Sequence, residues 1–290
     1  MGKPMRSVTH MKRSELISVA MGVRYRRREL DLLQRAIASI LGQSHANLEL
    51  LICENDSVQE ARELLEWYAA RDSRIRLING TGTSLLSEKL NRCIGAANGA
   101  WIARQDDDDA SDPLRLERQL AFLQEQPKYA FVGCNVRIEQ EGGILGVRQL
   151  PPAPVVKDFL FVQPFVHPTL LFRRDCLDAV SSYSQAKSRY GCEDYDLLLR
   201  LYQAGYQGAN LQDPCFTYHI PPPHVSNRPF SMRCNEVVTR WQRFKALGLL
   251  PRALPYVVKP AVVGLIPTGP LSRLKAAYRA TAFHKENRHE

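Results

Sequence analysis

Short apolar runs alternate with amphipathic stretches of helical periodicity through the first half of this chain. We expect strands at residues 16–21, 48–53, 75–78 and 101–103, and helices at 29–41, 58–71, 85–97 and 113–125. One strand and one helix together occupy roughly 25 to 30 residues, which is typical of successive β-α-β units. Such units predict an α/β fold in which helices flank a mostly parallel central sheet, with right-handed crossovers.

The second half of the chain is less regular. Residues 130–138 and 144–150 flank Glu141-Gly142-Gly143 and predict a β-hairpin. A further strand is expected at 169–172, and helices are expected at 194–204 and 235–247. From Pro221 a proline-rich break leads into a basic segment, so we expect a partly helical C-terminal extension over residues 221–290.

The composition is that of a globular protein with an excess of basic side chains. Hydrophobic residues make up 44% of the 290 residues, which excludes collagen-like and wholly disordered chains. The 39 Lys and Arg against 30 Asp and Glu give a formal net charge of +9. This charge suits a polyanionic partner, such as nucleic acid, an anionic membrane or a phosphorylated substrate, without choosing among them.

The cysteines and the apolar segments bear on where the chain works. Seven cysteines occur without a CxxC pair, which disfavours zinc-ribbon and thioredoxin-like sites and indicates free thiols in a reducing compartment. No early apolar run has the length of a signal-peptide core. None reaches the ~18 residues of a membrane span, and the nearest, Tyr256–Ile266, is broken by Lys259 and Pro260. We therefore expect a cytoplasmic protein.

The sharpest feature is the run of four aspartates Asp106–Asp109, which directly follows an expected strand. Like charges this close repel and raise each other's pKa, so a compensating cation is expected. Mg²⁺ and Mn²⁺ prefer oxygen ligands, and Mg²⁺ often bridges carboxylates to substrate phosphates. In open α/β sheets, ligands bind beyond the carboxyl ends of the strands. The alternative is a solvated acidic turn, with Asp112 capping the next helix.

Two further carboxylate clusters stand at comparable places. Cys53-Glu54-Asn55-Asp56-Ser57 follows the second strand, where its side chains either read a base edge or ribose or cap the next helix. Gly191-Cys192-Glu193-Asp194-Tyr195-Asp196 opens a helix. There a carboxylate either acts as a general base or simply favours the helix N-terminus.

Six segments that lie in order along the chain carry a family resemblance. They are Ile17–Val23 (an opening strand), Ala36–Ser44 ("SIL-x-Q-[ST]"), Leu90–Arg104 ("LN-x-G-x₃-A-x-GEYIAR"), Asp106–Asp109 ("DADD"), Pro164–Thr169 ("NPF-x-HPT") and Glu193–Leu197 ("ED"). Together they resemble the inverting family 2 glycosyltransferases, which have the GT-A (nucleotide-diphospho-sugar transferase) fold. The chain looks closest to the bacterial branch that builds capsule, exopolysaccharide and lipopolysaccharide, and the resemblance runs from residue 15 to 226.

The resemblance implies roles for the acidic run. Asp106 and Asp108 match the DxD motif, which implies Mn²⁺ or Mg²⁺ on Asp108 and Asp106 facing the ribose and the metal-bound waters. Asp109 is the trailing acid near the donor sugar, and Asp107 and Arg104 join the nucleotide-sugar site.

Two donor motifs of the family are changed in this chain. The usual "DDGS", whose carboxylate meets the nucleobase, is Glu54-Asn55-Asp56-Ser57 here; the amide can still read a base edge, and UDP is favoured. The usual "PTYN" is replaced by Gly22-Val23-Arg24-Tyr25, and arginines follow at 26, 27 and 28. This basic run either meets the donor diphosphate or is a solvated helix start.

The resemblance also implies a base for the reaction. Asp194 matches the catalytic carboxylate, with Glu193 as its neighbour. His167, His219 and His224 either complete a metal site or line the acceptor cleft, or are ordinary polar residues.

The resemblance predicts a metal-dependent inverting glycosyltransferase. It would move a sugar from a nucleotide-diphospho-sugar to a hydroxyl of a glycan or lipid-linked acceptor in cell-surface polysaccharide synthesis. A flexible N-terminus (1–14) would precede a catalytic domain at 15–220, with a nucleotide-sugar half (15–112) and an acceptor half (113–220). The basic extension would bind an anionic membrane at the cytoplasmic face of the inner membrane, or pack on the core as a helical subdomain.

Other functions fit the sequence less well. A sugar-phosphate nucleotidyltransferase usually needs a glycine-rich loop after the first strand, and Gly22 stands alone there. Nucleic-acid binding would require a basic strip interleaved with aromatic residues, and the aspartate run would repel phosphates. A non-catalytic scaffold of the same fold is a further alternative. A dehydrogenase is disfavoured because no GxGxxG follows a strand.

Overall fold

The N-terminal half of the protein is a parallel sheet with its connecting helices. The computed structural model describes residues 15–140, 143–220, 229–266, 269 and 283–284. Strands pair in the order β3-β2-β1-β4, and these elements are β1 (Ile17–Val23), α2 (Asp31–Leu41), β2 (Leu48–Glu54), α3 (Gln59–Ala69), β3 (Ile75–Asn79), α4 (Leu86–Ala96) and β4 (Trp101–Arg104). The predicted alternation and parallel pairing are confirmed here. The predicted flexible segment 1–14 lies outside the described residues.

The central strand β1 is buried along its whole length. Its residues alternate between two hydrophobic layers: Val19 packs in the layer that holds Ile37 of α2, and Ala20 packs in the layer that holds Leu90 of α4. Parallel strands covered by helices on both faces are expected to be apolar, which is why Ser18 is the one polar residue of β1. All seven cysteines are free thiols, as expected.

The second half of the sheet is mostly antiparallel. Strand β8 (Leu171–Arg173) pairs antiparallel with both β4 and β6 (Tyr129–Gln140). The predicted hairpin is present as β6 and β7 (Gly143–Arg148). The short strands β5 (Ala110–Ser111) and β10 (Phe283–His284) also pair antiparallel. The whole sheet is therefore mixed: the predicted parallel pairing holds throughout its N-terminal half and recurs between β6 and β9 (Gln207–His219).

Strand β9 (Gln207–His219) was not expected from the sequence. It pairs in parallel with β6 and antiparallel with β5, so it joins these two strands within the sheet. Its middle contains Asn210, Gln212, Asp213 and Pro214, and its register against β6 shifts at three places. A strand with bulges and polar residues lacks the period-two alternation by which strands are recognised.

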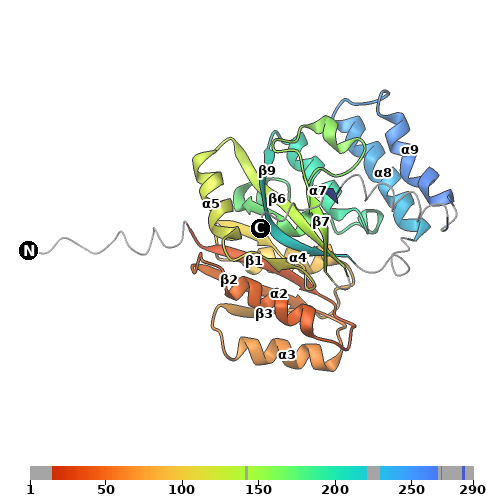
Figure 1. Ribbon diagram of the computed structural model, residues 1–290. Coiled ribbons are helices and arrows are strands. Elements are labelled where there is room, and N and C mark those ends of the chain that lie inside the picture. Colours follow the sequence, from red (N-terminus) through yellow and green to blue (C-terminus); the bar gives the residue numbers. More distant parts are fainter. Residues whose placement is uncertain (1–14, 141–142, 221–228, 267–268, 270–282, 285–290) are drawn as a thin grey trace, which may run out of the picture.

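Helices α7 (Glu193–Gln203), α8 (Phe230–Ala246) and α9 (Leu254–Leu265) pack at the end of the molecule farthest from α3 (Figure 1). The described chain after β4 also forms α5 (Arg115–Glu125), which packs in the same hydrophobic layer as α2 and α3, and α6 (Arg174–Ala179), with short 3₁₀ turns at Val156–Phe159, His167–Thr169 and Lys187–Arg189. Phe244 of α8 and Val257 of α9 are buried in the same layer as Leu198 of α7. Within the described residues, no helix has the length and apolar character needed to cross a bilayer.

The register of the parallel strands gathers four loops at one edge. Val23 lies beside Glu54, and Glu54 lies beside Asn79. Arg104 ends β4 next to Ala20 of β1. The segments that follow β1, β2, β3 and β4 therefore leave the sheet at its carboxyl edge, where ligands of open α/β sheets bind.

Candidate functional site

A pocket of about 380 Å³ lies at the carboxyl ends of β2 and β3. Glu54, Asn55, Asn79 and Thr81 line it. Asn55 Nδ2 donates to the carbonyl of Thr83 at 2.6 Å, which leaves Oδ1 as the atom that can accept from a ligand. We call this cavity the β2–β3 pocket.

The two loops that line the β2–β3 pocket approach each other closely. A Cβ on Gly80 would lie 1.9 Å from the carbonyl oxygen of Glu54, so only glycine fits there. Glu54 Oε1 accepts from the backbone N–H of Ser57 at 2.8 Å. Its carboxylate thus stabilises the turn before α3. The alternative that Asp56 or Ser57 caps α3 is wrong, because the N-cap is Val58 without a side-chain hydrogen bond, and Ser57 Oγ accepts from the backbone N–H of Tyr25 at 2.9 Å.

The aspartate run is held by basic side chains from two directions. Asp106 forms an ion pair with Arg104, whose side chain is buried. Asp108 Oδ2 forms an ion pair with Nη2 of Arg27 at 3.1 Å. Asp109 is fully buried, and its Oδ1 accepts from the backbone N–H of His219 at 2.8 Å. These contacts exclude the interpretation of the run as a freely solvated turn. The prediction that Asp112 caps α5 is wrong: the N-cap is Leu114 without a side-chain hydrogen bond, and both carboxylate oxygens of Asp112 accept from Arg137.

Negative charge in the aspartate run is incompletely balanced. Burial first, and the neighbouring carboxylates second, raise the pKa of Asp107 to about 7. Burial together with Asp106 also raises the pKa of Asp108, and that of Asp109 more strongly. Asp109 Oδ2 is buried without a hydrogen-bond partner. Asp109 thus has a buried carboxylate oxygen without a hydrogen bond, and two neighbouring carboxyl groups have a raised pKa. Both features fit the chemistry of a divalent-cation site.

The run does not form a complete cation cage by itself. Across the described ranges, no group of three or more His, Cys, Asp or Glu side chains converges in a metal-binding arrangement. Mg²⁺ commonly takes one or two protein carboxylates and completes its shell with substrate phosphates and water. A site of that open kind is the type that Asp106 and Asp108 can provide.

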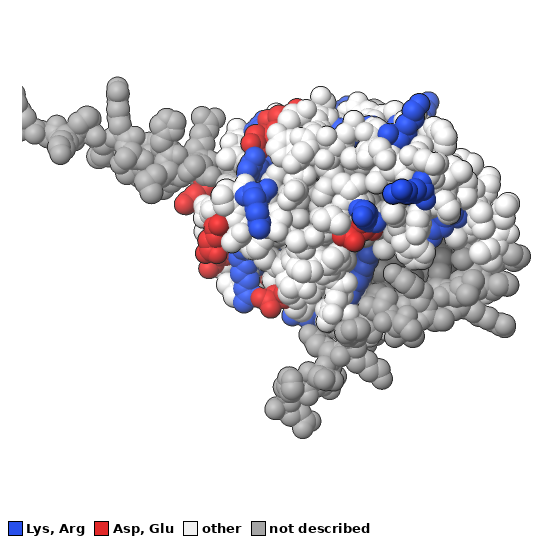
Figure 2. Space-filling model, turned by 90° about the horizontal axis from the view of Figure 1, so that it is seen from above, with Lys and Arg blue, Asp and Glu red and all other residues white. Residues whose placement is uncertain are grey.

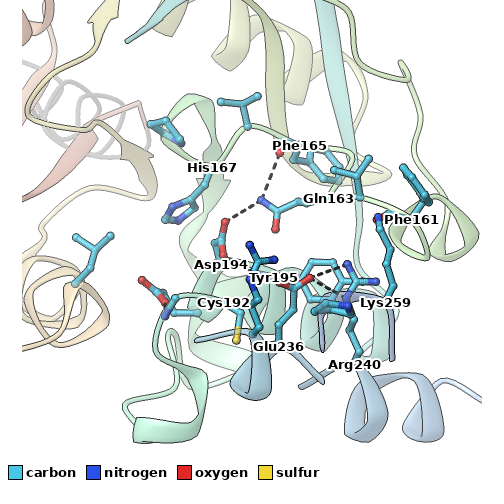
Figure 3. A pocket seen from close by; sticks show the side chains of 18 of the residues that line it. Phe161, Gln163, Phe165, His167, Cys192, Asp194, Tyr195, Glu236, Arg240 and Lys259 are labelled. Carbon is cyan, nitrogen blue, oxygen red and sulfur yellow. Dashed lines mark hydrogen bonds and ion pairs between the residues drawn. The ribbon is translucent and has the colours of Figure 1, made fainter. Parts of the chain in front are cut away.

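A larger cavity, of about 670 Å³, adjoins Asp106, the first residue of the aspartate run. It lies between Asp106, the segment 161–168, the start of α7, and helices α8 and α9, and we call it the α7 pocket. Figure 3 shows Asp194, His167 and Gln163 together on one side of it, with Glu236, Arg240 and Lys259 from α8 and α9 on the other. The two carboxylates Asp106 and Asp194 thus line one cavity.

Asp194 is oriented by two hydrogen bonds. Its Oδ2 accepts from Nε2 of Gln163 at 3.0 Å, and its Oδ1 accepts from the backbone N–H of Tyr195 at 2.8 Å. Its neighbour Glu193 accepts from the backbone N–H of Gly191 at 2.7 Å. Both side chains line the α7 pocket, so the carboxylates that open the helix reach a ligand cavity.

The three candidate histidines do not lie together at one site. His167 lines the α7 pocket, and its Nε2 shares a hydrogen bond of 2.6 Å with the hydroxyl of Tyr183. His219 lies on β9 beside Asp109, with Nδ1 3.5 Å from Oε2 of Glu139. His224 lies outside the described residues. His167 is therefore near the candidate base, and His219 is near the buried end of the aspartate run.

Sequence reasoning missed the buried carboxylate Asp196. Three guanidinium groups bind it: Nε of Arg189 at 3.0 Å, of Arg200 at 2.8 Å and of Arg243 at 2.7 Å. This arginine cluster joins α7 to α8. Only the Asp196–Arg200 pair, four residues apart on one helix, leaves a signal in the sequence.

His167 makes the stability of the protein sensitive to acid. Burial, with Arg104 as a second cause, lowers the pKa of His167 well below its usual 6.5. The folded state then binds fewer protons than the unfolded state, so this contribution to stability is complete above pH 6.5 and is lost as the pH falls below it. We expect the free energy of unfolding to decrease by up to ~1.4 kcal/mol per pH unit there.

Urea unfolding at several pH values checks this expectation. In His167→Gln, which keeps a polar side chain but cannot titrate, the slope between about pH 6.5 and pH 5 should be smaller than in the wild type. Equal slopes in the two proteins would show that His167 does not titrate as its burial implies.

Comparison with known proteins shows which family this chain resembles in sequence. The family model "Glycosyl transferase family 2" matches residues 24–180. EpsE of Bacillus subtilis, which is named as a glycosyltransferase, is 33% identical over 258 residues, covering 89% of this chain and 92% of EpsE.

Two solved structures share the fold. Staphylococcus aureus TarS in complex with UDP-GlcNAc aligns with a TM-score of 0.65 at 13% identity, covering 92% of this chain and 81% of that one. The mannosyltransferase PcManGT of Pyrobaculum calidifontis, in complex with GDP-Man and Mn²⁺, aligns with a TM-score of 0.58 at 18% identity, covering 91% and 80%.

The fold and the family match define a glycosyltransferase of the GT-A type. The chain belongs to glycosyl transferase family 2. The nucleotidyltransferase and nucleic-acid-binding alternatives are set aside by this membership.

Proposed function

We propose that this protein transfers a sugar from a nucleotide-diphospho-sugar, with a UDP-sugar favoured, to an acceptor hydroxyl with inversion at the anomeric carbon. The observation that carries the proposal is that Asp194 and Asp106 line one cavity. A base candidate thus faces the carboxylate run on which the family resemblance puts the donor diphosphate. The reaction would serve the synthesis of a bacterial cell-surface polysaccharide.

Asp194 would take the proton from the acceptor hydroxyl. The new bond to the anomeric carbon forms on the face opposite the bond to the diphosphate oxygen, which breaks and leaves the nucleoside diphosphate with its electron pair. Gln163 holds one carboxylate oxygen of Asp194, and this contact fixes the direction of the base. Glu193 would stay a supporting neighbour. The transition state should resemble an oxocarbenium ion, as in glycoside hydrolysis.

The carboxylates of Asp106 and Asp108 would hold Mn²⁺ or Mg²⁺ together with the donor diphosphate. The cation, when bound, would neutralise the leaving group as a Lewis acid. Asp107, Asp109 and Arg104 would shape the surroundings: Arg104 fixes Asp106 through their ion pair, and Asp109 anchors the run to β9 through the backbone of His219.

Asn55 would read the nucleobase in the β2–β3 pocket. Its Oδ1 is available to accept a hydrogen bond, because Nδ2 is committed to Thr83. The imide N3–H of uracil can donate to this oxygen, which fits the UDP-sugar that the family resemblance favours.

We expect calorimetry to find that UDP binds in the presence of Mn²⁺ and binds less tightly with EDTA. Asp108→Asn should remove most of the metal dependence, because it leaves only one carboxylate for the cation. The screen would compare UDP, GDP, CMP and dTDP, each with Mn²⁺, Mg²⁺ or EDTA. Asp213→Asn, at an exposed side chain on β9, is the matched control. Absence of binding by every nucleotide would contradict the proposed donor site.

The acceptor would be lipid-linked and would reach Asp194 from a membrane surface. One face of α9 lines the α7 pocket through Lys259, Pro260 and Val263. The opposite face exposes Leu254, Val258, Val262 and Leu265, which recur at helical spacing. The helix carries no acidic residue. An apolar face with basic neighbours is typical of helices that lie on anionic bilayers.

The surface charge supports the same orientation. The side of the molecule toward α8 and α9 shows basic side chains and broad white areas in Figure 2, and acidic side chains gather toward the other side. Lys245 of α8 and Arg252, which precedes α9, are exposed basic residues. A bilayer docked here would lie next to the mouth of the α7 pocket.

Vesicle cosedimentation tests the membrane proposal. The wild type should bind phosphatidylcholine vesicles that contain phosphatidylglycerol, and the double variant Val258→Glu/Val262→Glu should bind about tenfold less, because it puts two charges on the apolar face. Trp67→Glu, at a comparably exposed apolar residue on α3, is the control and should bind like the wild type. Equal binding by the double variant would show that α9 is not the docking face.

A further inference from the structure

The loop after β1 connects two acidic clusters. Asp56, beyond β2, forms ion pairs with Arg24 at 2.7 Å and with Arg26. Asp108, beyond β4, forms its ion pair with Arg27 at 3.1 Å. Because β1 lies between β2 and β4, this arginine loop crosses the carboxyl edge of the sheet between the β2–β3 pocket and the aspartate run. In the proposed function, the donor diphosphate would lie next to this loop.

In the free protein, Arg27 forms an ion pair with Asp108, the carboxylate that would bind the cation. Its guanidinium is 40% exposed and the Asp108 side chain 27%. A pair this open contributes little free energy, since water screens it and competes for both partners. Arg27 can therefore leave Asp108 at small cost when a better partner arrives. Guanidinium groups bind phosphate oxygens through paired, charge-assisted hydrogen bonds, so a diphosphate is such a partner.

We propose that Arg27 is a donor-binding residue that exchanges partners: it holds Asp108 in the free protein and binds the diphosphate when donor and cation enter together. The proposal rests on the proposed function and adds to it how the binding of the donor and the binding of the cation depend on each other. Without nucleotide, Mn²⁺ must compete with Arg27 for Asp108. With nucleotide, the diphosphate takes Arg27 and leaves Asp108 to the cation. Donor and cation then favour each other's binding, and by linkage the coupling is reciprocal.

The exchange predicts opposite effects from one substitution. In Arg27→Gln, Asp108 loses its competitor, so the nucleotide-free protein should bind Mn²⁺ about three- to fivefold more tightly, the range of a partly exposed ion pair. UDP binding in EDTA should weaken about tenfold, because a charge-assisted contact to the diphosphate is lost. Arg27→Lys, which keeps the charge but not the paired geometry, should lie between the wild type and Arg27→Gln in both measurements.

Electron paramagnetic resonance of free Mn²⁺ and calorimetry of UDP supply the two readouts, neither of which depends on turnover. Arg28→Gln is the matched control: it makes the same charge change one residue further on, at an exposed side chain. It should move both affinities by less than about twofold, as expected for a surface charge. Asp108→Asn should bind Mn²⁺ weakly whether or not Arg27 is replaced.

The outcomes separate this proposal from the proposed function. Tighter Mn²⁺ and weaker UDP binding in Arg27→Gln alone support the exchange. If the wild type binds both ligands and Arg27→Gln behaves like Arg28→Gln, the exchange is wrong and the donor site stands. Loss of both affinities in Arg27→Gln would make Arg27 a structural residue and would also overturn the exchange. A wild type that binds neither ligand would contradict both proposals.

Discussion

Replacing Asp194 by Asn is expected to slow sugar transfer by about a thousandfold while leaving donor affinity unchanged within about twofold. The amide has nearly the same shape as the carboxylate but cannot take a proton from the acceptor. The backbone N–H of Tyr195 can still donate to the amide oxygen and keep the side chain in place, so the loss should fall on the chemical step. Initial rates of nucleoside diphosphate release, with calorimetry of UDP on the same protein, measure the two quantities separately.

Glu193→Gln is the informative comparison for Asp194→Asn. Glu193 lines the same cavity and is held by the backbone of Gly191, so its replacement should cost about tenfold or less. If Glu193→Gln were the slower variant and Asp194→Asn transferred sugar at the wild-type rate, the base would be Glu193 and the assignment of Asp194 would be wrong.

The largest loss of stability is expected from Asp196→Asn. The carboxylate is fully buried, and Arg189, Arg200 and Arg243 all bind it. Removing its charge leaves three buried or half-buried guanidinium groups without their shared partner. Breaking a buried ion pair from one side costs about 3–5 kcal/mol, which for a chain of this size corresponds to a fall in Tm of about 10 °C.

Thermal unfolding of a matched variant gives the control for Asp196→Asn. Asp178→Asn removes an exposed aspartate that pairs with Arg174 at 3.7 Å, and such a pair contributes about 0–1 kcal/mol. Similar Tm values for Asp196→Asn and Asp178→Asn would contradict the view that the arginine cluster holds α8 against α7. Because α8 and α9 form one wall of the α7 pocket, a weaker cluster should also raise the KM for the acceptor.

The sequence predicted the parallel half of the fold well because its signals are local. A strand such as β1, covered on both faces, must be almost wholly apolar, and the helix between two such strands shows its own period. The aspartate run was equally visible, since four adjacent carboxylates after a buried strand require compensation. What compensates them was not visible: Arg27 lies 81 residues away from Asp108.

The rest of the site depends on contacts between distant segments. Strand β9 contains polar residues and pairs with β6 through three register shifts, and no local pattern encodes that pairing. The α7 pocket is closed by α8 and α9, which reach it through Arg240 and Lys259. The arginine run after β1 left two interpretations open, contact with the donor diphosphate or a solvated helix start, and no local pattern predicts its ion pairs to Asp56 and Asp108.

A crystal structure of the protein with UDP and Mn²⁺ would test the central claim most directly. The account predicts the uracil in the β2–β3 pocket with its imide N–H on Asn55, the cation on Asp108, the diphosphate between that cation and Arg27, and the open side of the diphosphate facing Asp194. A nucleotide bound elsewhere, such as in the α7 pocket against Arg240, or a cation held away from Asp106 and Asp108, would contradict it.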